Sequence, residues 1–255
     1  MTVENGPKIA LITGAAKRVG AAIARRLHRE GFSVAIHYRA SKTDADALAK
    51  ELNAIRANSA AIFQADLLVT FALDVLVQAV VARFGRLDAL INNASTFYGG
   101  TLDAVDEASW IELIGSNLKA PLFLCKAAAP ELKRFNGSIV NITDIHAERP
   151  MANYVIYNVA KAGLRGLTHA LARDLAPAAE GEAYVRVNAV APGPIDWPDD
   201  DQIDAAEKAR IIDHVPLKRE GGVAQIAEAV KYLVCDATYV TGQTINVDGG
   251  RSIAI

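Results

Sequence analysis

Tyr157 and Lys161 are the residues of this sequence whose types and spacing are best suited to chemistry. They stand four residues apart within 154–175, where the apolar pattern predicts a long helix, so both side chains lie on one helix face. A nearby ammonium favours the phenolate, and we therefore expect Lys161 to lower the pKa of Tyr157 from about 10 towards working pH. Such a tyrosine can donate or accept a proton during hydride chemistry. The pattern also occurs by chance on surface helices, so its weight depends on its surroundings.

A glycine-containing turn lies near the start of the chain. Residues 8–13 (KIALIT) predict a short strand, and residues 19–30 have a helical pattern. In the turn between them, TGAAKRVG, Gly14 permits a sharp bend and Gly20 permits close packing of the helix on the sheet. The helix N-terminus presents free N–H groups and a partial positive charge. This turn therefore predicts a site for a pyrophosphate, with a plain strand-to-helix turn as the alternative.

The end of the second predicted strand carries no acidic residue. Dinucleotide-binding sheets that use NAD place an Asp or Glu there for the ribose 2′-hydroxyl, whereas this chain has HYRAS at residues 37–41. Arg18, Arg39 and Ser41 are placed to surround a 2′-phosphate, which a guanidinium binds in bidentate fashion. The sequence therefore favours NADPH, and a solvated basic turn is the alternative.

Strands and helices alternate along the whole chain. The predicted strands are short apolar runs without alternation, which suits a parallel sheet covered on both faces. The pattern predicts an α/β fold, a single domain over residues 1–255 with a doubly wound parallel sheet of about seven strands. Residues 192–204 are too rich in Pro and Asp for a strand and predict a substrate loop at about 192–216. Strands are predicted at 8–13, 32–37, 60–64, 87–91, 137–142, 185–190 and 244–247, and helices at 19–30, 44–57, 75–84, 110–134 (one or two), 154–175 and 225–234.

Composition excludes several classes of function. The 255 residues carry a formal net charge of −2 and no long basic run, which argues against nucleic-acid binding. No run of about 18 apolar residues predicts a membrane span, and the polar N-terminus is no signal peptide. Cys125 and Cys235 form no CxxC pair, so we expect reduced thiols in a cytoplasmic protein and no metal site.

Several motifs together resemble the short-chain dehydrogenase/reductase family. TGAAKRVG resembles its TGxxxGxG turn with Arg18 in place of the middle glycine, a variant similar to that of pteridine reductases. Residues 92–98 (NNASTFY) look like the NNASSFY segment of those enzymes, in which the Phe stacks on the pterin. YxxxK and the VDGG at 247–250 also match, and the resemblance extends from Ile9 to Arg251. It implies a Rossmann-type fold.

The most informative departure from the wider family lies thirteen residues before Tyr157. Most members have Ser there, whereas this chain has Asp144, as pteridine reductases and dihydromonapterin reductases do. A serine hydroxyl would orient a carbonyl, whereas a carboxyl can carry a proton or grip an amidine-like ring edge. The alternative is an Asp that only satisfies backbone N–H groups. The resemblance assigns catalysis to Asp144, Tyr157, Lys161 and Asn117.

The resemblance also implies the binding residues. Substrate contacts are expected at Ser95, Phe97, Asp144, Tyr157 and Trp197, with Trp197 as a lid. Cofactor contacts are expected at Gly14, Lys17, Arg18, Val19, Gly20, His37, Tyr38, Arg39, Ser41, Asp66, Leu67, Asn93, Ala94, Ser95, Tyr157, Lys161, Pro192 and Gly193.

The function implied is that of an NADPH-dependent pteridine reductase acting on a dihydropterin, with dihydrofolate as a further candidate substrate. Hydride would reach a ring carbon, and Tyr157 with Lys161 and Asp144 would supply a proton to a ring nitrogen. The alternative is a carbonyl reductase of the same family with a 3-oxoacyl or sugar-type substrate. A non-catalytic NADP sensor is disfavoured by the intact Tyr157 and Lys161. The family is usually tetrameric, which implies a homotetramer; whether Arg251 reaches a neighbouring site stays open.

Overall fold

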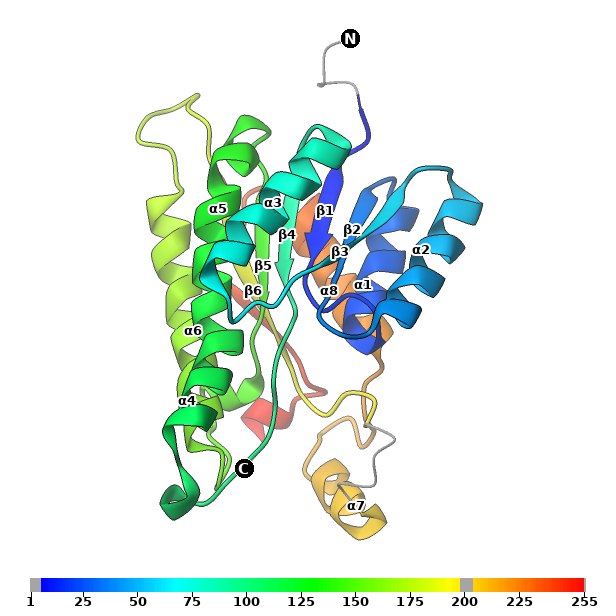
Figure 1. The fold of residues 1–255 in the computed structure, drawn as a ribbon. Coiled ribbons are helices and arrows are strands. Elements are labelled where there is room, and N and C mark those ends of the chain that lie inside the picture. Colours follow the sequence, from blue (N-terminus) through cyan, green and yellow to red (C-terminus); the bar gives the residue numbers. More distant parts are fainter. Residues whose placement is uncertain (1–5, 198–203, 255) are drawn as a thin grey trace.

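The computed structural model describes residues 6–197 and 204–254. Within them, seven parallel strands form one sheet in the order β3-β2-β1-β4-β5-β6-β7 (Figure 1). After β3 the chain returns to the centre of the sheet, and β4 pairs with the free side of β1, as in a doubly wound Rossmann-type sheet, so the predicted fold class is confirmed. The strands are β1 (Ile9–Ile12), β2 (Ser33–Tyr38), β3 (Ala60–Gln64), β4 (Ala89–Asn92), β5 (Ser138–Ile142), β6 (Arg186–Pro192) and β7 (Thr244–Val247).

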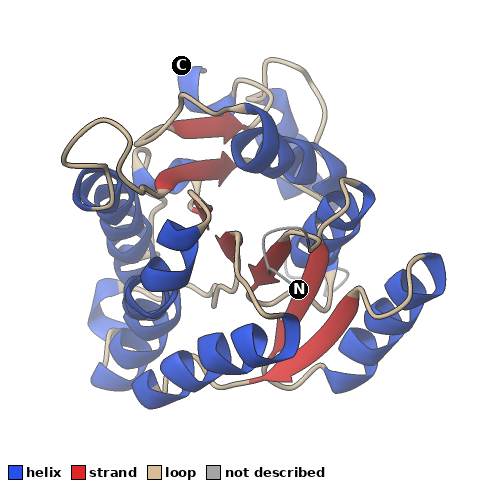
Figure 2. Cartoon of the chain, turned by 90° about the horizontal axis from the view of Figure 1, so that it is seen from above, coloured by secondary structure: helices blue, strands red, loops and turns tan. Residues whose placement is uncertain are grey.

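Helices cover both faces of this sheet (Figure 2). Successive strand residues point to opposite faces, so Ile12 of β1 packs in one apolar core and Leu11 in the other. Both side chains are fully buried, which explains why the strand is apolar without alternation. The first core is covered by α1 (Arg18–Arg29), α2 (Lys42–Ile55) and α8 (Val223–Lys231), and the second by α3 (Thr70–Phe84), α5 (Ala120–Arg134) and α6 (Val155–Asp174).

The segment between β6 and α8 differs from the predicted loop. It contains a helix, α7 (Ala205–Asp213), which begins where the carboxylate of Asp204 accepts the Glu207 N–H at 2.8 Å. Figure 1 shows α7 beyond the carboxyl ends of the strands. The proline- and aspartate-rich composition just before it concealed the helix. Part of the predicted loop, residues 198–203, lies outside the described residues.

A chain of buried polar side chains joins two central strands to a helix. Asn92 at the end of β4 donates to Asn141 of β5 at 2.8 Å, and Asn141 donates to Thr168 of α6 at 2.9 Å. The Thr168 hydroxyl in turn donates to the Leu164 carbonyl. Asn92 and Asn141 are register partners in the sheet. These contacts fix the sheet just beneath the carboxyl ends of its strands.

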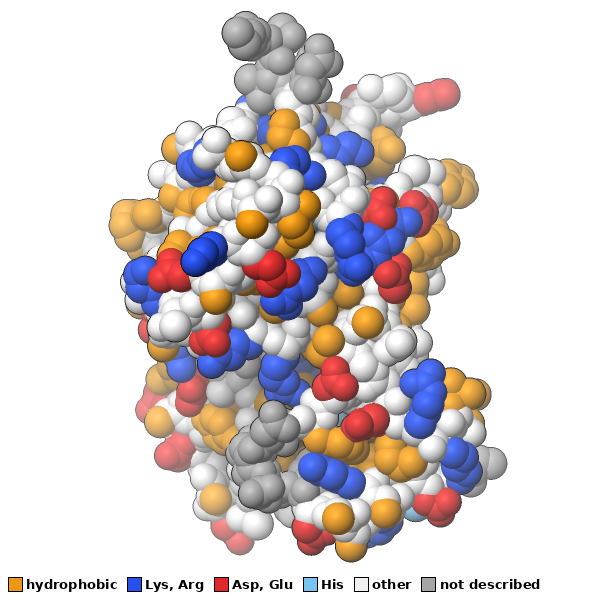
Figure 3. Space-filling view, turned by 90° about the vertical axis from the view of Figure 1, so that its right-hand side faces the viewer, with side chains coloured by type: hydrophobic (Ala, Val, Ile, Leu, Met, Phe, Trp, Pro, Cys, Tyr) orange, Lys and Arg blue, Asp and Glu red, His pale blue; other side chains and the backbone are white. Residues whose placement is uncertain are grey.

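On the face shown in Figure 3, Lys and Arg side chains are spread over the surface with Asp and Glu between them. None of the described helices is long and apolar enough to cross a membrane.

Candidate active site

The turn between β1 and α1 is shaped by two glycines. Gly14 has a left-handed backbone, with φ +60°. A Cβ on Gly20 would lie 2.3 Å from the Gly14 carbonyl oxygen and 2.7 Å from Asn93 Nδ2, so no larger residue fits. Lys17 begins α1 without a side-chain cap bond, and the first turn holds no acidic residue. The free N–H groups and the close backbone approach fit the pyrophosphate of a dinucleotide.

Arg18 has a left-handed backbone as well, with φ +48°. That region favours glycine, which explains the usual glycine at this place, and an arginine there costs roughly 1–3 kcal/mol. Its side chain is exposed and donates from Nη2 to the Asp196 carbonyl at 2.7 Å. The guanidinium therefore lies between the phosphate turn and the segment that follows β6.

His37 is almost fully buried at the end of β2. Its Nδ1 accepts the Gly14 N–H at 3.0 Å, and its Nε2 lies 3.1 Å from the Ala65 carbonyl. Burial lowers the pKa of His37 to about 4, so the ring is neutral. Both ring nitrogens are occupied by the backbone, and the ring fixes the phosphate turn; a direct contact to cofactor stays a prediction.

Two further residues are predicted to surround the 2′-phosphate, Arg39 and the half-buried Ser41. Arg39 is exposed, and the Ser41 hydroxyl makes no cap bond to α2. Lys17 forms an ion pair with Asp44 at 3.0 Å. Tyr38 is buried beside them and Val19 is half-buried.

The ends of β4, β3 and β6 lie at the same edge of the sheet, because these strands are parallel. Asn93 Nδ2 donates to the carbonyls of Thr13 and Gly14 at 2.8 and 3.1 Å, which ties β4 to the phosphate turn. Ala94 N donates to the Thr13 hydroxyl. Gly193, after Pro192, passes so close to Asp248 that a Cβ would lie 2.5 Å from its side chain. After β3, the Asp66 carboxylate accepts the Leu68 N–H, and Leu67 is buried.

The predicted catalytic pair Asp144 and Tyr157 is joined directly. Asp144 follows β5 and Tyr157 lies in the first turn of α6, and the Tyr157 hydroxyl donates to Asp144 Oδ2 at 2.7 Å. Asp144 Oδ1 accepts the His146 N–H at 2.8 Å. One carboxylate oxygen therefore caps the backbone turn while the other holds the tyrosine, so the structural and catalytic interpretations of Asp144 both have a physical basis.

The expected lowering of the Tyr157 pKa is wrong for this arrangement. Burial, followed by the charge of Asp144, raises the pKa of Tyr157 well above its ordinary value, and a hydrogen bond with Ser95 works in the opposite direction. The Lys161 ammonium lies 5.6 Å from the centre of the Tyr157 ring. Tyr157 is thus a protonated phenol that holds its proton more tightly than a free tyrosine does.

Lys161 is buried one turn further along α6. Its Nζ donates to the Ile142 carbonyl at 3.0 Å, at the end of β5. Burial lowers the pKa of Lys161 to about 8, and Asp144 opposes that shift. A lysine with such a pKa changes charge close to neutral pH, which suits a group that assists proton transfer.

Asn117 lies in a π-helical turn, Gly115–Lys119, between α4 (Glu107–Ile114) and α5. π-helical turns are rare in proteins, and those that occur are often found at functional sites. Its Oδ1 accepts the Ser95 hydroxyl at 2.6 Å, and its Nδ2 donates to the Leu113 and Thr96 carbonyls at 3.0 and 2.9 Å. Asn117 therefore holds residues 95–96, which follow β4, against the end of α4.

Phe97 lies at the catalytic pair and not in either core. Its ring stacks on Tyr154 and meets the Tyr157 ring edge-on, with centroids 4.9 Å apart. A cavity of about 110 Å³ borders Tyr154 and Tyr157 on the side of Tyr98 and Leu113. The structure thus brings Asp144, Tyr157 and the predicted substrate residue Phe97 together.

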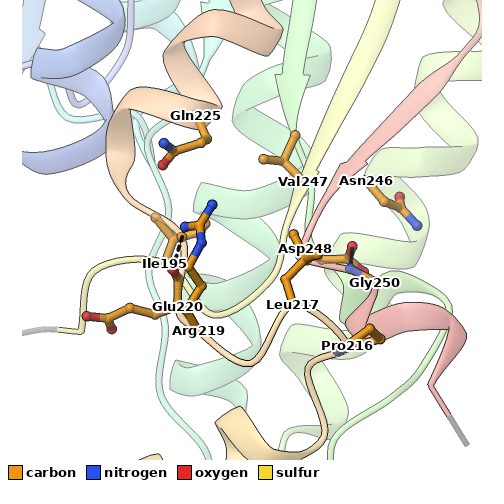
Figure 4. Close-up of a pocket in the computed structure, with 12 residues that line it drawn as sticks. Ile195, Pro216, Leu217, Arg219, Glu220, Gln225, Asn246, Val247, Asp248 and Gly250 are labelled. Atoms are coloured by element: carbon orange, nitrogen blue, oxygen red, sulfur yellow. Dashed lines mark hydrogen bonds between the residues drawn. The ribbon is translucent and has the colours of Figure 1, made fainter.

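Trp197 is half-buried in the segment after β6, and its role as a lid stays a prediction. A cavity of about 430 Å³ opens nearby, between Ile195, residues 216–221 and the end of β7 (Figure 4). Asp248 lines it, but its two carboxylate oxygens accept the N–H groups of Gly250 and Ser252. This cavity lies apart from the Asp144–Tyr157 pair.

Sequence reasoning missed Tyr154 and Asp196. Tyr154 precedes the YxxxK motif by three residues, and this helical spacing to Tyr157 was the available signal. Asp196 contacts a residue 178 positions away, which no local pattern indicates.

A family model described as enoyl-(acyl carrier protein) reductase matches residues 14–252. The chain belongs to the short-chain dehydrogenase/reductase family. The match covers the phosphate turn, the Tyr157–Lys161 pair and the end of β7, and the chain is therefore an oxidoreductase of the type that uses a nicotinamide cofactor.

Curated relatives of this short-chain dehydrogenase/reductase include two kinds of enzyme. Pteridine reductase 1 of Leishmania tarentolae is 37% identical over 293 aligned positions, covering 99% of each chain. A 3-oxoacyl-(acyl-carrier-protein) reductase of Staphylococcus aureus is 36% identical over 245, covering 95% of this chain and 97% of its own. An uncharacterized oxidoreductase of Methylorubrum extorquens is 34% identical. Identity alone does not separate a pterin from an oxoacyl substrate.

Proposed function

We propose that this chain is an NADPH-dependent pteridine reductase that reduces a dihydropterin, with dihydrofolate as a further candidate substrate. The observation that carries the proposal is the 2.7 Å hydrogen bond from the Tyr157 hydroxyl to the Asp144 carboxylate. A carboxylate beside the proton donor can accept an N–H from the edge of a pterin, which a serine hydroxyl does less strongly.

The roles of the residues follow from their contacts. NADPH, when bound, supplies the hydride for the ring carbon. Tyr157 holds the proton for the ring nitrogen, because its pKa is raised by burial and Asp144. Asp144 keeps that hydroxyl in place and faces the substrate edge. Lys161 lies behind the pair with its ammonium on the Ile142 carbonyl, and Asn117 with Ser95 holds the neighbouring segment.

The aromatic residue Phe97 supports a flat substrate. Its ring lies 4.9 Å from that of Tyr157 and is 50% exposed, so its open surface is available for stacking beside the proton donor. We propose that Trp197, in the segment after β6, closes the substrate site as a lid.

The preference for NADPH is proposed to come from Arg18, Arg39 and Ser41 around the 2′-phosphate. A charge-assisted phosphate contact contributes about 1.5–3 kcal/mol, so Arg39→Ala should weaken NADPH binding roughly ten- to hundredfold and leave NADH binding nearly unchanged. Equal losses for both cofactors would contradict this assignment.

The second candidate is a carbonyl reductase acting on a 3-oxoacyl substrate. It is favoured by the Staphylococcus aureus reductase, which matches this chain almost as well as the pteridine reductase does.

One experiment separates the two. NADPH oxidation is followed with dihydrobiopterin, dihydrofolate and a 3-oxoacyl thioester, in the native protein and in Asp144→Ser. We expect the native protein to turn over the pterin, and Asp144→Ser to lose most of that activity without unfolding. Preferred turnover of the thioester, or full pterin turnover by Asp144→Ser, would reject the pteridine reductase.

We also propose a homotetramer in the cytoplasm. Exposed apolar side chains on α4, α5 and α6 favour association, namely Trp110, Ile111, Leu122, Val155 and Val159. Sedimentation equilibrium tests it, and a monomer at micromolar concentration would overturn it.

A further inference from the structure

The Arg18 guanidinium is bound by a residue that is distant in the sequence, Asp196. Arg18 Nη2 donates to the Asp196 carbonyl at 2.7 Å, although the two residues are 178 positions apart. Both have left-handed backbones, with φ +48° at Arg18 and +30° at Asp196. Non-glycine residues keep this conformation only where their surroundings enforce it.

The surroundings of Asp196 are built to fix that carbonyl. Its Oδ2 accepts the Val223 N–H at the start of α8, at 2.8 Å, and its own N–H donates to the Gly221 carbonyl at 3.1 Å. Ile195 forms a bridge with Gly221, and the Gly221 N–H donates to the Pro194 carbonyl. Asp196 is thereby bonded to the α8 N-terminus through its side chain and to the preceding segment through its main chain.

Helix α8 packs along α1, the helix that begins at the phosphate turn. A carboxylate at the N-terminus of α8 is stabilised by the helix dipole. The path from α8 through the Asp196 carboxylate to the Asp196 carbonyl therefore ends on the guanidinium at the start of α1. These contacts set the direction of the Arg18 side chain, which the Arg18 backbone alone does not fix.

We propose that Asp196 is a positioning residue for the cofactor phosphate, acting through Arg18. The inference rests on the proposed use of NADPH. A guanidinium has five N–H donors in a fixed fork, and Asp196 occupies only one side of it. Among the residues that the structure describes, no other acceptor binds these donors, so they are available to a phosphate. The bound side removes freedom that a long exposed side chain would otherwise lose on binding.

The test compares two substitutions at Asp196. Alanine removes the acceptor for the Val223 N–H and disfavours the left-handed backbone, whereas asparagine keeps an acceptor and tolerates that backbone. Dissociation constants for NADPH and NADH are measured by titration calorimetry without any substrate. We expect Asp196→Ala to weaken NADPH binding about tenfold, close to the loss of one charge-assisted contact, with NADH nearly unchanged. Asp196→Asn should stay within about twofold of the native value.

A double-mutant cycle shows whether the effect passes through Arg18. In an Arg18→Ala background, Asp196→Ala should cause no further loss of NADPH affinity. Glu182→Ala is the matched control, because the Glu182 carboxylate also accepts backbone N–H groups, those of Ala178 and Ala179, in the loop before β6 at the opposite end of the sheet. It should leave both dissociation constants unchanged.

The outcomes separate this inference from the proposed function. If the native protein binds NADPH and NADH equally, the proposed use of NADPH is rejected before any variant is made. The positioning role of Asp196 is then rejected as well. If the native protein prefers NADPH, additive losses in the cycle, equal losses for NADH, or a loss in Asp196→Asn as large as in Asp196→Ala would overturn the positioning role alone. Circular dichroism establishes that each variant is folded; if Asp196→Ala does not fold, the Asp196→Asn cycle decides, with a loss above threefold counting against the role.

Discussion

The ring of Phe97 stacks on the ring of Tyr154, with centroids 5.0 Å apart and planes inclined by 16°. Tyr157 meets the same phenyl ring edge-on. Phe97 is thus packed against Tyr154 and against the proposed proton donor Tyr157, although half of it is exposed. A side chain held in this way loses little freedom when a flat ligand stacks on it.

Phe97→Ala should therefore raise the KM for the pterin several-fold, since stacking contributes around 0.5–1.5 kcal/mol beyond the area buried. NADPH affinity should not change. Steady-state kinetics with dihydrobiopterin measures the first and calorimetry the second. Phe71→Ala is the control, because Phe71 is a more exposed phenylalanine on α3. A pterin KM that does not move would remove Phe97 from the substrate site.

Tyr157→Phe removes only the hydroxyl that donates to Asp144. Loss of the proton donor should cut turnover by about 10² or more, while NADPH binding is kept. Tyr239→Phe, at a fully exposed tyrosine, is the matched control. Turnover that falls less than tenfold would mean that another group delivers the proton.

Lys161 should leave a signature in the pH dependence of stability. Its pKa is about 8 in the folded chain, lowered by burial from 10.5, so the unfolded chain binds the extra proton between these values. Stability must then rise with pH from about 8 to about 10.5, with a slope near 1.4 kcal/mol per pH unit. Below pH 8 the buried ammonium costs about 3 kcal/mol.

Lys161→Met replaces the ammonium by an apolar chain of similar length. It removes the contribution of Lys161 to the pH dependence of the free energy of unfolding. Urea unfolding at pH 7 and pH 9.5 measures both proteins, and the titrations of groups that do not interact with Lys161 cancel in the difference. We expect the native protein to gain stability relative to Lys161→Met as the pH rises. A constant difference would show that Lys161 is solvated in the folded state.

Gly20→Ala should disrupt the phosphate turn, because its Cβ would overlap the Gly14 carbonyl and Asn93. Overpacking of this kind costs about 1–3 kcal/mol, and NADPH binding should weaken with it. Gly166→Ala is the contrast: it lies in α6 with no atom within 4 Å of a Cβ, so it should stabilise by about 0.5–1 kcal/mol. Urea unfolding with and without NADPH compares them, and equal effects would contradict the role of Gly20.

Much of the fold could be predicted because its signals are local. Apolar runs such as 8–13 and 87–91 became β1 and β4, and the glycines around Arg18 marked the first crossover. Helix α7 was missed because a helix of nine residues leaves little periodicity beside prolines and aspartates.

The candidate site was less predictable, since its physics depends on burial. The spacing of Tyr157 and Lys161 indicated a pair, but the sign of the Tyr157 pKa shift depends on desolvation and on a carboxylate brought in by β5. A histidine side chain can bind a phosphate, yet the position of His37 in β2 directs its ring inward, where its Nδ1 accepts the Gly14 N–H. Asp196 contacts Arg18 across 178 positions of sequence, so the contact depends on the tertiary fold and leaves no local signal.

The amide chain from Asn92 to Thr168 bears on how the chain avoids misfolding. Parallel strands that are apolar on both faces could pair in several alignments with nearly equal hydrophobic gain. A shift of β5 by one residue against β4 would separate Asn92 from Asn141 and leave buried amides without partners, at about 1–3 kcal/mol for each group. The two hydrogen bonds from Asn92 to Asn141 and from Asn141 to Thr168 thus act as a check on strand alignment, because a sheet shifted by one residue loses them.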